Sequence, residues 1–239
     1  MQMLFDTQRL AALAERERVR YAAAMPFPHC VLDEFLPAAA AEQLLQAFPG
    51  PEQDVAWQKF SVSGFEVKLA SNDLERLPEP IAQALLQFNS GPFLRFLERL
   101  TGIEHLLADP HLSGGGVHLI GHGGHLGVHA DFNWHPGIEA HRRINFLLYL
   151  NPAWLPEYHG DLELWSTDAT RCVRQVAPLF NRVVIFNTRS DTFHGHPAPL
   201  AVPPGVYRRS LALYYYSSDR PASERMEPHS TRYKGYHIA

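Results

Sequence analysis

A histidine and an aspartate two residues apart, His129 and Asp131, are the residues of this sequence whose types and spacing first suggest chemistry. They stand in GVHADFNWHPGIEAHRRINFLLYLN, residues 127–151, just before a run that is typical of a β-strand. In an extended backbone, the side chains of residues i and i+2 point to the same face. An imidazole and a carboxylate on one face could bind a divalent first-row metal. The alternative is a polar loop that binds nothing.

A third ligand could come from the segment DTFHGHPAPL, which contains His194 and His196. Two histidines and one carboxylate, with the remaining coordination positions open, are the ligand set of non-haem Fe(II) oxygenases. The intervening sequence is long enough for strands to run out and back, which would bring a later strand beside the first. From the spacing alone, either histidine could complete the site, and either could be an ordinary loop histidine. Seven of the chain's 14 histidines lie between His111 and His141, so that metal-binding side chains cluster around this pair.

Two adjacent arginines open the strand-like segment GVYRRSLALYYYS. Strand alternation gives one face of small and polar side chains, namely Arg208, Ser210, Ala212 and Tyr214. The opposite face carries Arg209, Leu211 and Leu213. The leucine face should pack against helices, so we expect Arg208 to point into the interior, where its planar fork could hold a carboxylate. The alternative, an arginine at the surface end of a strand, suits Arg209 better.

Tyr149 is expected to point into the same interior. In RRINFLLYLN it shares a face with Asn145 and Leu147, whereas the other face is uniformly large and apolar. Its hydroxyl could donate to the carboxylate that Arg208 holds; the alternative is a core tyrosine with a different partner. Candidate substrate contacts are Asn133 and Trp134, which follow Asp131, and Tyr214, with ordinary packing as the alternative for each. The remaining nearby histidines are interpreted as surface loop residues rather than as part of the substrate rim: His122, His125, His135 and His141.

The order of the predicted elements indicates one α+β domain over residues 1–239. Residues 1–105 are expected to be mainly helical, with helices over 7–24, 37–48, 78–89 and 91–102 and a strand or two around FEVKLAS. Short strand-like segments separated by turns fill residues 114–217, which indicates a β-sandwich or closed barrel with the helices on one side. Residues 218–239 form a polar tail that is expected to cap the domain loosely.

Composition narrows the function classes. Apolar residues make up 46% of the chain and charged residues 19%, so a large core can form. The net charge of −4 and the lack of Lys/Arg clusters argue against a nucleic-acid or membrane-surface partner. No apolar run approaches the ~20 residues of a membrane span, and the N-terminus does not look like a signal peptide. Cys30 and Cys172 are expected to be free thiols, which favours a cytoplasmic location.

Taken together, these motifs resemble a known family. His129-x-Asp131, LLYLN, GDLELW, FHGHP and RRSLALYYY are similar to segments of the 2-oxoglutarate- and Fe(II)-dependent oxygenases, in particular the prolyl 4-hydroxylase-like subgroup. The resemblance covers residues 115–217 and, more faintly, VLDEFLPAAAAEQLLQAFP. It implies a double-stranded β-helix, which is a distorted jelly roll, with N-terminal helices packed on one face.

The resemblance also implies roles for individual residues. His129, Asp131 and His194 would hold Fe(II), because the family's distal histidine begins a short H-G/x-x-P turn that matches His194 better than His196. Arg208 matches the family's basic residue for the distal carboxylate of 2-oxoglutarate, and Tyr149 matches the tyrosine before LN. The family's collagen-type members have lysine where Arg208 stands. Many members also have paired glycines before the LELW-like strand, where this chain has Gly160 followed by Asp161.

The expected function is therefore hydroxylation of an unactivated C–H bond by Fe(II), 2-oxoglutarate and O2, with 2-oxoglutarate decarboxylated to succinate and ascorbate keeping the iron reduced. Asp131 favours hydroxylation, because halogenating relatives lack this carboxylate. The sequence leaves the substrate open between a small molecule and a prolyl or other residue of a protein, and it does not predict the oligomeric state. The alternative is a cupin-like jelly-roll module that binds a metal or ligand without turnover. A zinc hydrolase ranks last, because no His-Glu-x-x-His motif supplies its general base.

Overall fold

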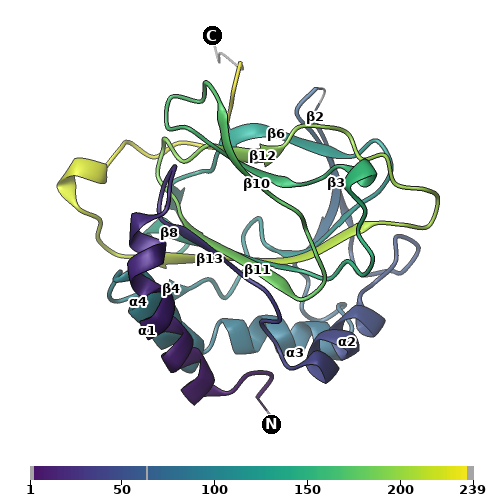
Figure 1. Ribbon diagram of the computed structural model, residues 1–239, viewed down its shortest axis with the longest axis horizontal. Coiled ribbons are helices and arrows are strands. Elements are labelled where there is room, and N and C mark those ends of the chain that lie inside the picture. The colour runs from purple at the N-terminus through teal and green to yellow at the C-terminus, as the bar shows by residue number, and fades with distance from the viewer. Residues whose placement is uncertain (1–2, 63, 236–239) are drawn as a thin grey trace.

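The helices of the computed structural model lie together beneath one face of a rolled β-sheet (Figure 1). The structure describes residues 3–62 and 64–235, without the side chain of Val62. Within these residues the α-helices are α1 (Thr7–Ala23), α2 (Ala38–Ala47), α3 (Glu79–Phe88) and α4 (Gly91–Thr101), with short 3₁₀ turns at Pro156–Tyr158 and Ala222–Glu224. Asp6 caps α1 by accepting hydrogen bonds from the backbone N–H groups of Gln8 and Arg9. These bounds confirm the four helices expected from the sequence.

The strands follow one another in an antiparallel arrangement. Their bounds are β1 (His29–Leu32), β2 (Gln58–Val62), β3 (Glu66–Ser71), β4 (Leu107–Ala108), β5 (Gly116–Ile120), β6 (His125–Ala130), β7 (Trp134–His135), β8 (Ala140–Tyr149), β9 (Leu162–Trp165), β10 (Cys172–Val176), β11 (Arg182–Asn187), β12 (His194–His196), β13 (Arg208–Ser217) and β14 (Arg232–Tyr233). Along the sheet their order is β1-β11-β8-β13-β5-β3-β6-β12-β9-β10. The short strands β2, β4, β7 and β14 pair with β3, β13, β8 and β6, respectively.

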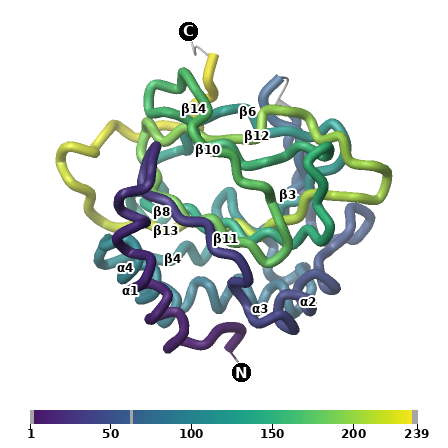
Figure 2. The backbone as a smooth tube through the Cα atoms, viewed as in Figure 1, coloured from purple at the N-terminus to yellow at the C-terminus, as the bar shows by residue number. Residues whose placement is uncertain are grey.

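The sheet folds into two layers that face each other across the interior. Strands β8, β11 and β13 form the layer next to the helices, and β6, β10 and β12 lie in the opposite layer (Figures 1 and 2). Strand β8 pairs with β13 over almost its whole length and with β11 on its other edge. The outer side chains of this layer pack against the helices. The ring of Phe146, for example, lies 4.9 Å from that of Phe88 and 5.2 Å from that of Phe93, measured between centroids.

The first third of the chain contributes strands to this sheet as well as helices. Strand β1 pairs with β11, and β3 lies between β5 and β6, where it bridges the two layers. The C-terminal segment returns across the sheet, since β14 pairs with β6 at Ala130 and His129. Residues 236–239, the end of the expected tail, lie outside the described residues. The division into a helical support, a β-core and a tail stays a prediction.

Two further expectations concern the chain as a whole. Cys30 and Cys172 are both free thiols, as the sequence predicts. Among the residues that the structure describes, no helix is both long enough and apolar enough to cross a membrane.

Candidate active site

The pairing of β6 with β12 brings together the three side chains that could bind a metal. His129 lies in β6, Asp131 directly follows that strand, and His194 is the first residue of β12, where it stands opposite His129. The ligand atoms of the three residues all lie within 4.8 Å of one another. Nε2 of His129 and Nε2 of His194 are each 3.5 Å from an oxygen of Asp131. The strand register therefore adds His194 to the pair that His129 and Asp131 already form as near neighbours in sequence.

Gly195 allows the two strands to approach each other so closely. A Cβ atom at this position would lie 2.7 Å from the carbonyl oxygen of Gly127 and 2.8 Å from that of Leu126, both in β6. These distances are shorter than real Cβ contacts, so any other residue would push β12 away from β6. Glycine in the HGH segment is thus part of what places His194 against His129.

Both histidines are oriented for metal binding by their Nδ1 atoms. Nδ1 of His129 donates to the carbonyl of Gly127 over 2.8 Å, and Nδ1 of His194 donates to the carbonyl of Thr192 over 3.2 Å. Because a carbonyl only accepts hydrogen bonds, each Nδ1 carries the proton and each Nε2 keeps its lone pair for a metal. Burial lowers the pKa of His194 to about 4, against the opposing charge of Asp131, so its ring is neutral near pH 7.

Asp131 is held as a carboxylate by a buried arginine. Burial alone would raise the pKa of Asp131, but Arg142, His194 and His129 together keep the pKa well below its ordinary value. Nη2 of Arg142 lies 3.1 Å from Oδ2 of Asp131. The guanidinium is itself placed between two aromatic rings, 4.4 Å from the centroid of Phe132 and 3.4 Å from that of Tyr214.

Asn145 completes the support of this carboxylate. Its Nδ2 donates to Oδ2 of Asp131 over 2.8 Å, while its Oδ1 accepts two hydrogen bonds from Arg142, over 2.8 and 3.1 Å. Asn145 and Arg142 therefore fix which way the carboxylate faces. The sequence pattern correctly puts Asn145 on the inner face of β8 but gives no sign of this bond.

Asn145→Ala is expected to weaken the affinity for a divalent metal by about 10- to 100-fold, because the carboxylate ligand loses the hydrogen bond that orients it. Calorimetric titration with Mn(II) as a stand-in for Fe(II) measures the effect. Asn133→Ala is a matched control, since Asn133 is also buried and lies near Asp131 in sequence but bonds elsewhere. Equal losses in both variants would show that the bond from Asn145 to Asp131 does not orient the ligand.

The other end of the same interior holds the predicted arginine and tyrosine. Nε of Arg208 donates to the carbonyl of Gly160 over 2.8 Å, and Nη2 donates to the hydroxyl of Tyr149 over 3.2 Å. The hydroxyl proton of Tyr149 is thus left to donate to a ligand. Burial raises the pKa of Tyr149 although Arg208 opposes this shift, so the hydroxyl keeps that proton at neutral pH. Arg208 is 5% exposed, which confirms that it points inward rather than to solvent.

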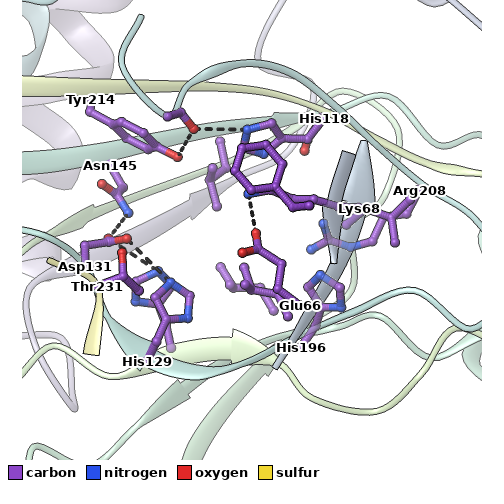
Figure 3. Close-up of a pocket in the computed structure, with 18 of the residues that line it drawn as sticks. Glu66, Lys68, His118, His129, Asp131, Asn145, His196, Arg208, Tyr214 and Thr231 are labelled. Carbon is purple, nitrogen blue, oxygen red and sulfur yellow. Dashed lines mark hydrogen bonds and ion pairs between the residues drawn. The ribbon is translucent and has the colours of Figure 1, made fainter. Parts of the chain in front are cut away.

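A single cavity of about 280 Å³ connects the two ends (Figure 3). Its walls include the three candidate metal ligands as well as Arg208 and Tyr149. The lining also includes apolar side chains, among them Ile120, Leu126, Leu147 and Leu162. The donor set fits a divalent metal, and a buried cation at a distance from it fits an elongated ligand that carries a carboxylate at its far end.

A family model described as the 2OG-Fe(II) oxygenase superfamily matches residues 115–216, which contain both ends of this cavity. Over these residues the chain is similar to the 2OG-Fe(II) oxygenase superfamily, as the sequence motifs predict. Fe(II), 2-oxoglutarate and O2 are the cofactors of this superfamily, as predicted, and the donor set described above fits them. The need for ascorbate stays a prediction.

Individual proteins similar to this chain are prolyl hydroxylases by name. Prolyl 3-hydroxylase OGFOD1 of Mus musculus is 26% identical over 185 residues, which are 71% of this chain and 29% of that protein. The chain thus spans less than a third of the length of this curated relative. Among solved structures, a Trichoplax adhaerens prolyl hydroxylase in complex with a hypoxia-inducible-factor peptide has a TM-score of 0.62 at 18% identity, covering 92% of this chain and 96% of its own.

A prolyl 4-hydroxylase from Phytophthora capsici gives a TM-score of 0.58 at 23% identity, covering 91% of this chain and 68% of its own. At such identities the two structures show the fold alone. They bear out the predicted α+β class and the double-stranded β-helix with N-terminal helices on one face.

Beyond the residues expected of this superfamily, β3 brings charged side chains into the cavity. Glu66 and Lys68 both line it and form an ion pair of 2.8 Å. Glu66 also accepts a hydrogen bond of 2.9 Å from the hydroxyl of Tyr233, whose ring lies 5.5 Å from that of His129. These residues were missed because β3 precedes the segments that carry the motifs. The alternation of FEVKLAS, which puts Glu66 and Lys68 on one face, was the available signal.

His118 and His196 are two further cavity residues. Nε2 of His118 lies 3.2 Å from the carbonyl of Gly114. His196, the sequence alternative to His194, lies two residues beyond it on β12 and also lines the cavity. Burial lowers the pKa of His196 well below its ordinary value, and Arg208 is the nearby charge that adds most to this shift.

The candidate substrate residues separate into different places. Tyr214 lines the cavity and donates a hydrogen bond of 3.0 Å to the carbonyl of Gly114. Trp134 lines a neighbouring, more open pocket of about 650 Å³, which shares Gly114, Phe132 and Thr231 with the cavity. Asn133 instead forms hydrogen bonds with the C-terminal segment. It donates to the carbonyl of Glu227 over 3.0 Å and accepts from the backbone N–H of His229 over 2.8 Å.

The histidines interpreted as surface residues do not all lie at the surface. His122 is exposed, and His125 and His141 are half-buried. His135 is buried, which contradicts the surface interpretation. Its Nε2 lies 2.7 Å from the hydroxyl of Ser113, and its ring lines the open pocket. Its Nδ1 accepts from the backbone N–H groups of Gly137 and Ile138, but the loop with Ser113 that covers it is distant in sequence, so the local pattern could not reveal the burial.

Proposed function

We propose that this chain is an Fe(II)- and 2-oxoglutarate-dependent dioxygenase that hydroxylates an unactivated C–H bond. The observation that carries the proposal is the single cavity with the His129–Asp131–His194 cluster at one end and buried Arg208 at the other. A cupin-like binding module has no need of a buried cation in the same cavity as its metal. The arginine therefore favours turnover over metal binding alone.

Each group in the cavity has a distinct task in this proposal. His129, Asp131 and His194 bind the iron, and Arg142 and Asn145 orient the carboxylate. Arg208 and Tyr149 donate to the distal carboxylate of 2-oxoglutarate, and the apolar side chains of the lining keep water from part of the cavity. With the metal bound, O2, 2-oxoglutarate and the substrate C–H group are converted to succinate, carbon dioxide and the hydroxylated product.

For the substrate, we propose a prolyl residue within an extended peptide. Two observations support this choice: the relatives described above are prolyl hydroxylases by name, and an open pocket adjoins the cavity on the side of the metal ligands. Phe132, Trp134 and Pro136 line that pocket and offer aromatic and apolar surface to a proline ring. A free amino acid or other small metabolite is the competing substrate class. A cytoplasmic location, expected from the free thiols, is part of the same proposal.

Succinate formation tests the proposal. The protein is supplied with Fe(II), 2-oxoglutarate and ascorbate, and proline-containing peptides are compared with peptides in which alanine replaces the proline. We expect succinate to rise above the uncoupled background with some proline peptides and not with their alanine counterparts, with a mass increase of one oxygen in the peptide. Tightly held zinc and no 2-oxoglutarate turnover under any condition would favour the binding module instead. If only small molecules stimulate succinate formation, the proposal of a peptide substrate is wrong and the proposed dioxygenase activity stands.

A further inference from the structure

The cavity contains a buried histidine that the cofactor sites described so far do not use. His196 is 3% exposed, and neither of its ring nitrogens has a hydrogen-bond partner among the residues that the structure describes. Buried polar side chains in folded proteins are almost always paired, because an unpaired one loses its hydration without compensation. An unpaired imidazole that lines a binding cavity therefore points to a ligand.

The strand geometry places His196 at a particular depth in the cavity. His194 and His196 are two residues apart on β12 and both line the cavity. The pairing of β12 with β6 shifts register between these two residues, and at an extended rise of about 3.3 Å per residue their Cα atoms are separated by at most roughly 7 Å. This is comparable to the distance between the two carboxylates of 2-oxoglutarate. If His194 holds the metal that binds the keto-acid end, His196 is level with the distal carboxylate.

The surroundings of His196 agree with this depth. Figure 3 shows it on the same side of the cavity as Arg208, across from Asp131. The open pocket proposed for the substrate joins the cavity at Gly114, Phe132 and Thr231. His196 does not line that pocket, so a substrate bound there would not be its partner. Lys68, the other cation in this region, is already paired with Glu66. His196 also borders a smaller pocket of about 220 Å³.

We propose that His196 binds 2-oxoglutarate by donating a ring N–H to its distal carboxylate, as a third donor beside Arg208 and Tyr149. The inference rests on the proposed function, since it assigns a residue to the co-substrate of that reaction. Three donors around one carboxylate make the cavity selective for a 2-oxo acid that carries a second carboxylate. His196 is in this sense a specificity-determining residue for the co-substrate.

The test compares two ligands and two variants by calorimetry on Mn(II)-loaded protein, with no turnover required. The ligands are 2-oxoglutarate and 2-oxopentanoate, which has the same five-carbon chain without the distal carboxylate. His196→Phe removes the ring nitrogens and keeps a planar ring, and His196→Asn keeps a donor. We expect His196→Phe to weaken 2-oxoglutarate binding by roughly tenfold or more while 2-oxopentanoate binding stays within about twofold, and His196→Asn to recover part of the loss.

The outcomes separate this inference from the proposed function. If the unaltered protein binds 2-oxoglutarate and His196→Phe weakens both acids equally, or neither, the contact with the distal carboxylate does not exist and the proposed function stands. If the unaltered protein binds no 2-oxoglutarate, both fail together. Mn(II) affinity measured in the same titrations should be unchanged in both variants, since His196 is not a metal ligand in this arrangement.

Discussion

His194→Ala is expected to abolish 2-oxoglutarate turnover and to weaken Fe(II) binding by more than about 100-fold. Loss of residues that merely orient metal ligands typically costs 10- to 100-fold in affinity, and loss of one of three protein ligands should cost more. Outside the metal cluster the side chain donates to the carbonyl of Thr192 and packs against the ring of Phe186, so thermal unfolding of the variant checks that the fold is kept. Metal content after anaerobic Fe(II) loading and succinate production measure the two effects.

Two matched variants make this prediction specific. His122→Ala removes an exposed histidine of the same region and should leave metal content unchanged. His196→Phe removes the neighbouring histidine of the HGH segment and should also keep the iron. Full iron content in His194→Ala, or loss of iron only in His196→Phe, would mean that the distal ligand has been misassigned.

Arg208→Ala is expected to raise the dissociation constant of 2-oxoglutarate by roughly 100- to 1,000-fold without changing metal affinity. A hydrogen bond between charged partners contributes about 1.5–3 kcal/mol, and the guanidinium can donate two to one carboxylate. Titration of the Mn(II)-loaded protein with 2-oxoglutarate measures the change. Arg208→Lys should be intermediate, because an ammonium keeps the charge but not the planar fork.

Arg209→Ala is the control, since Arg209 is adjacent in sequence but lies on the other face of β13, with its guanidinium 5.9 Å from the centroid of the Tyr207 ring. Because Arg208 also donates to the carbonyl of Gly160, its removal could destabilise the fold. Thermal unfolding of each variant shows whether the protein is still folded. A normal 2-oxoglutarate affinity in folded Arg208→Ala would show that Arg208 does not bind the distal carboxylate. A loss of 2-oxoglutarate affinity in Arg209→Ala would assign that role to Arg209.

Much of the inner lining followed from strand alternation, because β8 and β13 lie in a layer with helices on one side and the cavity on the other. On such strands the face with large apolar side chains packs against the helices, and the face with smaller, more polar side chains lines the cavity. Phe146 and Asn145 are an example of the two faces. The choice of His194 over His196 required the family resemblance. Both residues face the cavity, and only the pairing of β12 with β6 sets His194 against His129.

The residues that the sequence did not reveal depend on contacts between distant segments. Glu66 and Lys68 enter the cavity because β3 lies between β5 and β6, a pairing that no local pattern encodes. Asn133 follows the metal-binding pair in sequence, which suggested a substrate contact, but the returning C-terminal segment takes up its amide. In these cases tertiary pairing decided the position of a side chain whose type alone was ambiguous.

The most direct test of the central claim, that one cavity holds Fe(II) and 2-oxoglutarate together, is an anaerobic titration followed by visible absorption. A 2-oxo acid that chelates Fe(II) gives a charge-transfer band that neither component gives alone. We predict that the Fe(II)-loaded protein develops this band stoichiometrically with 2-oxoglutarate, that His194→Ala does not, and that Arg208→Ala needs far more of the acid. An Fe(II)-loaded wild-type protein that stays colourless at saturating 2-oxoglutarate would contradict the account.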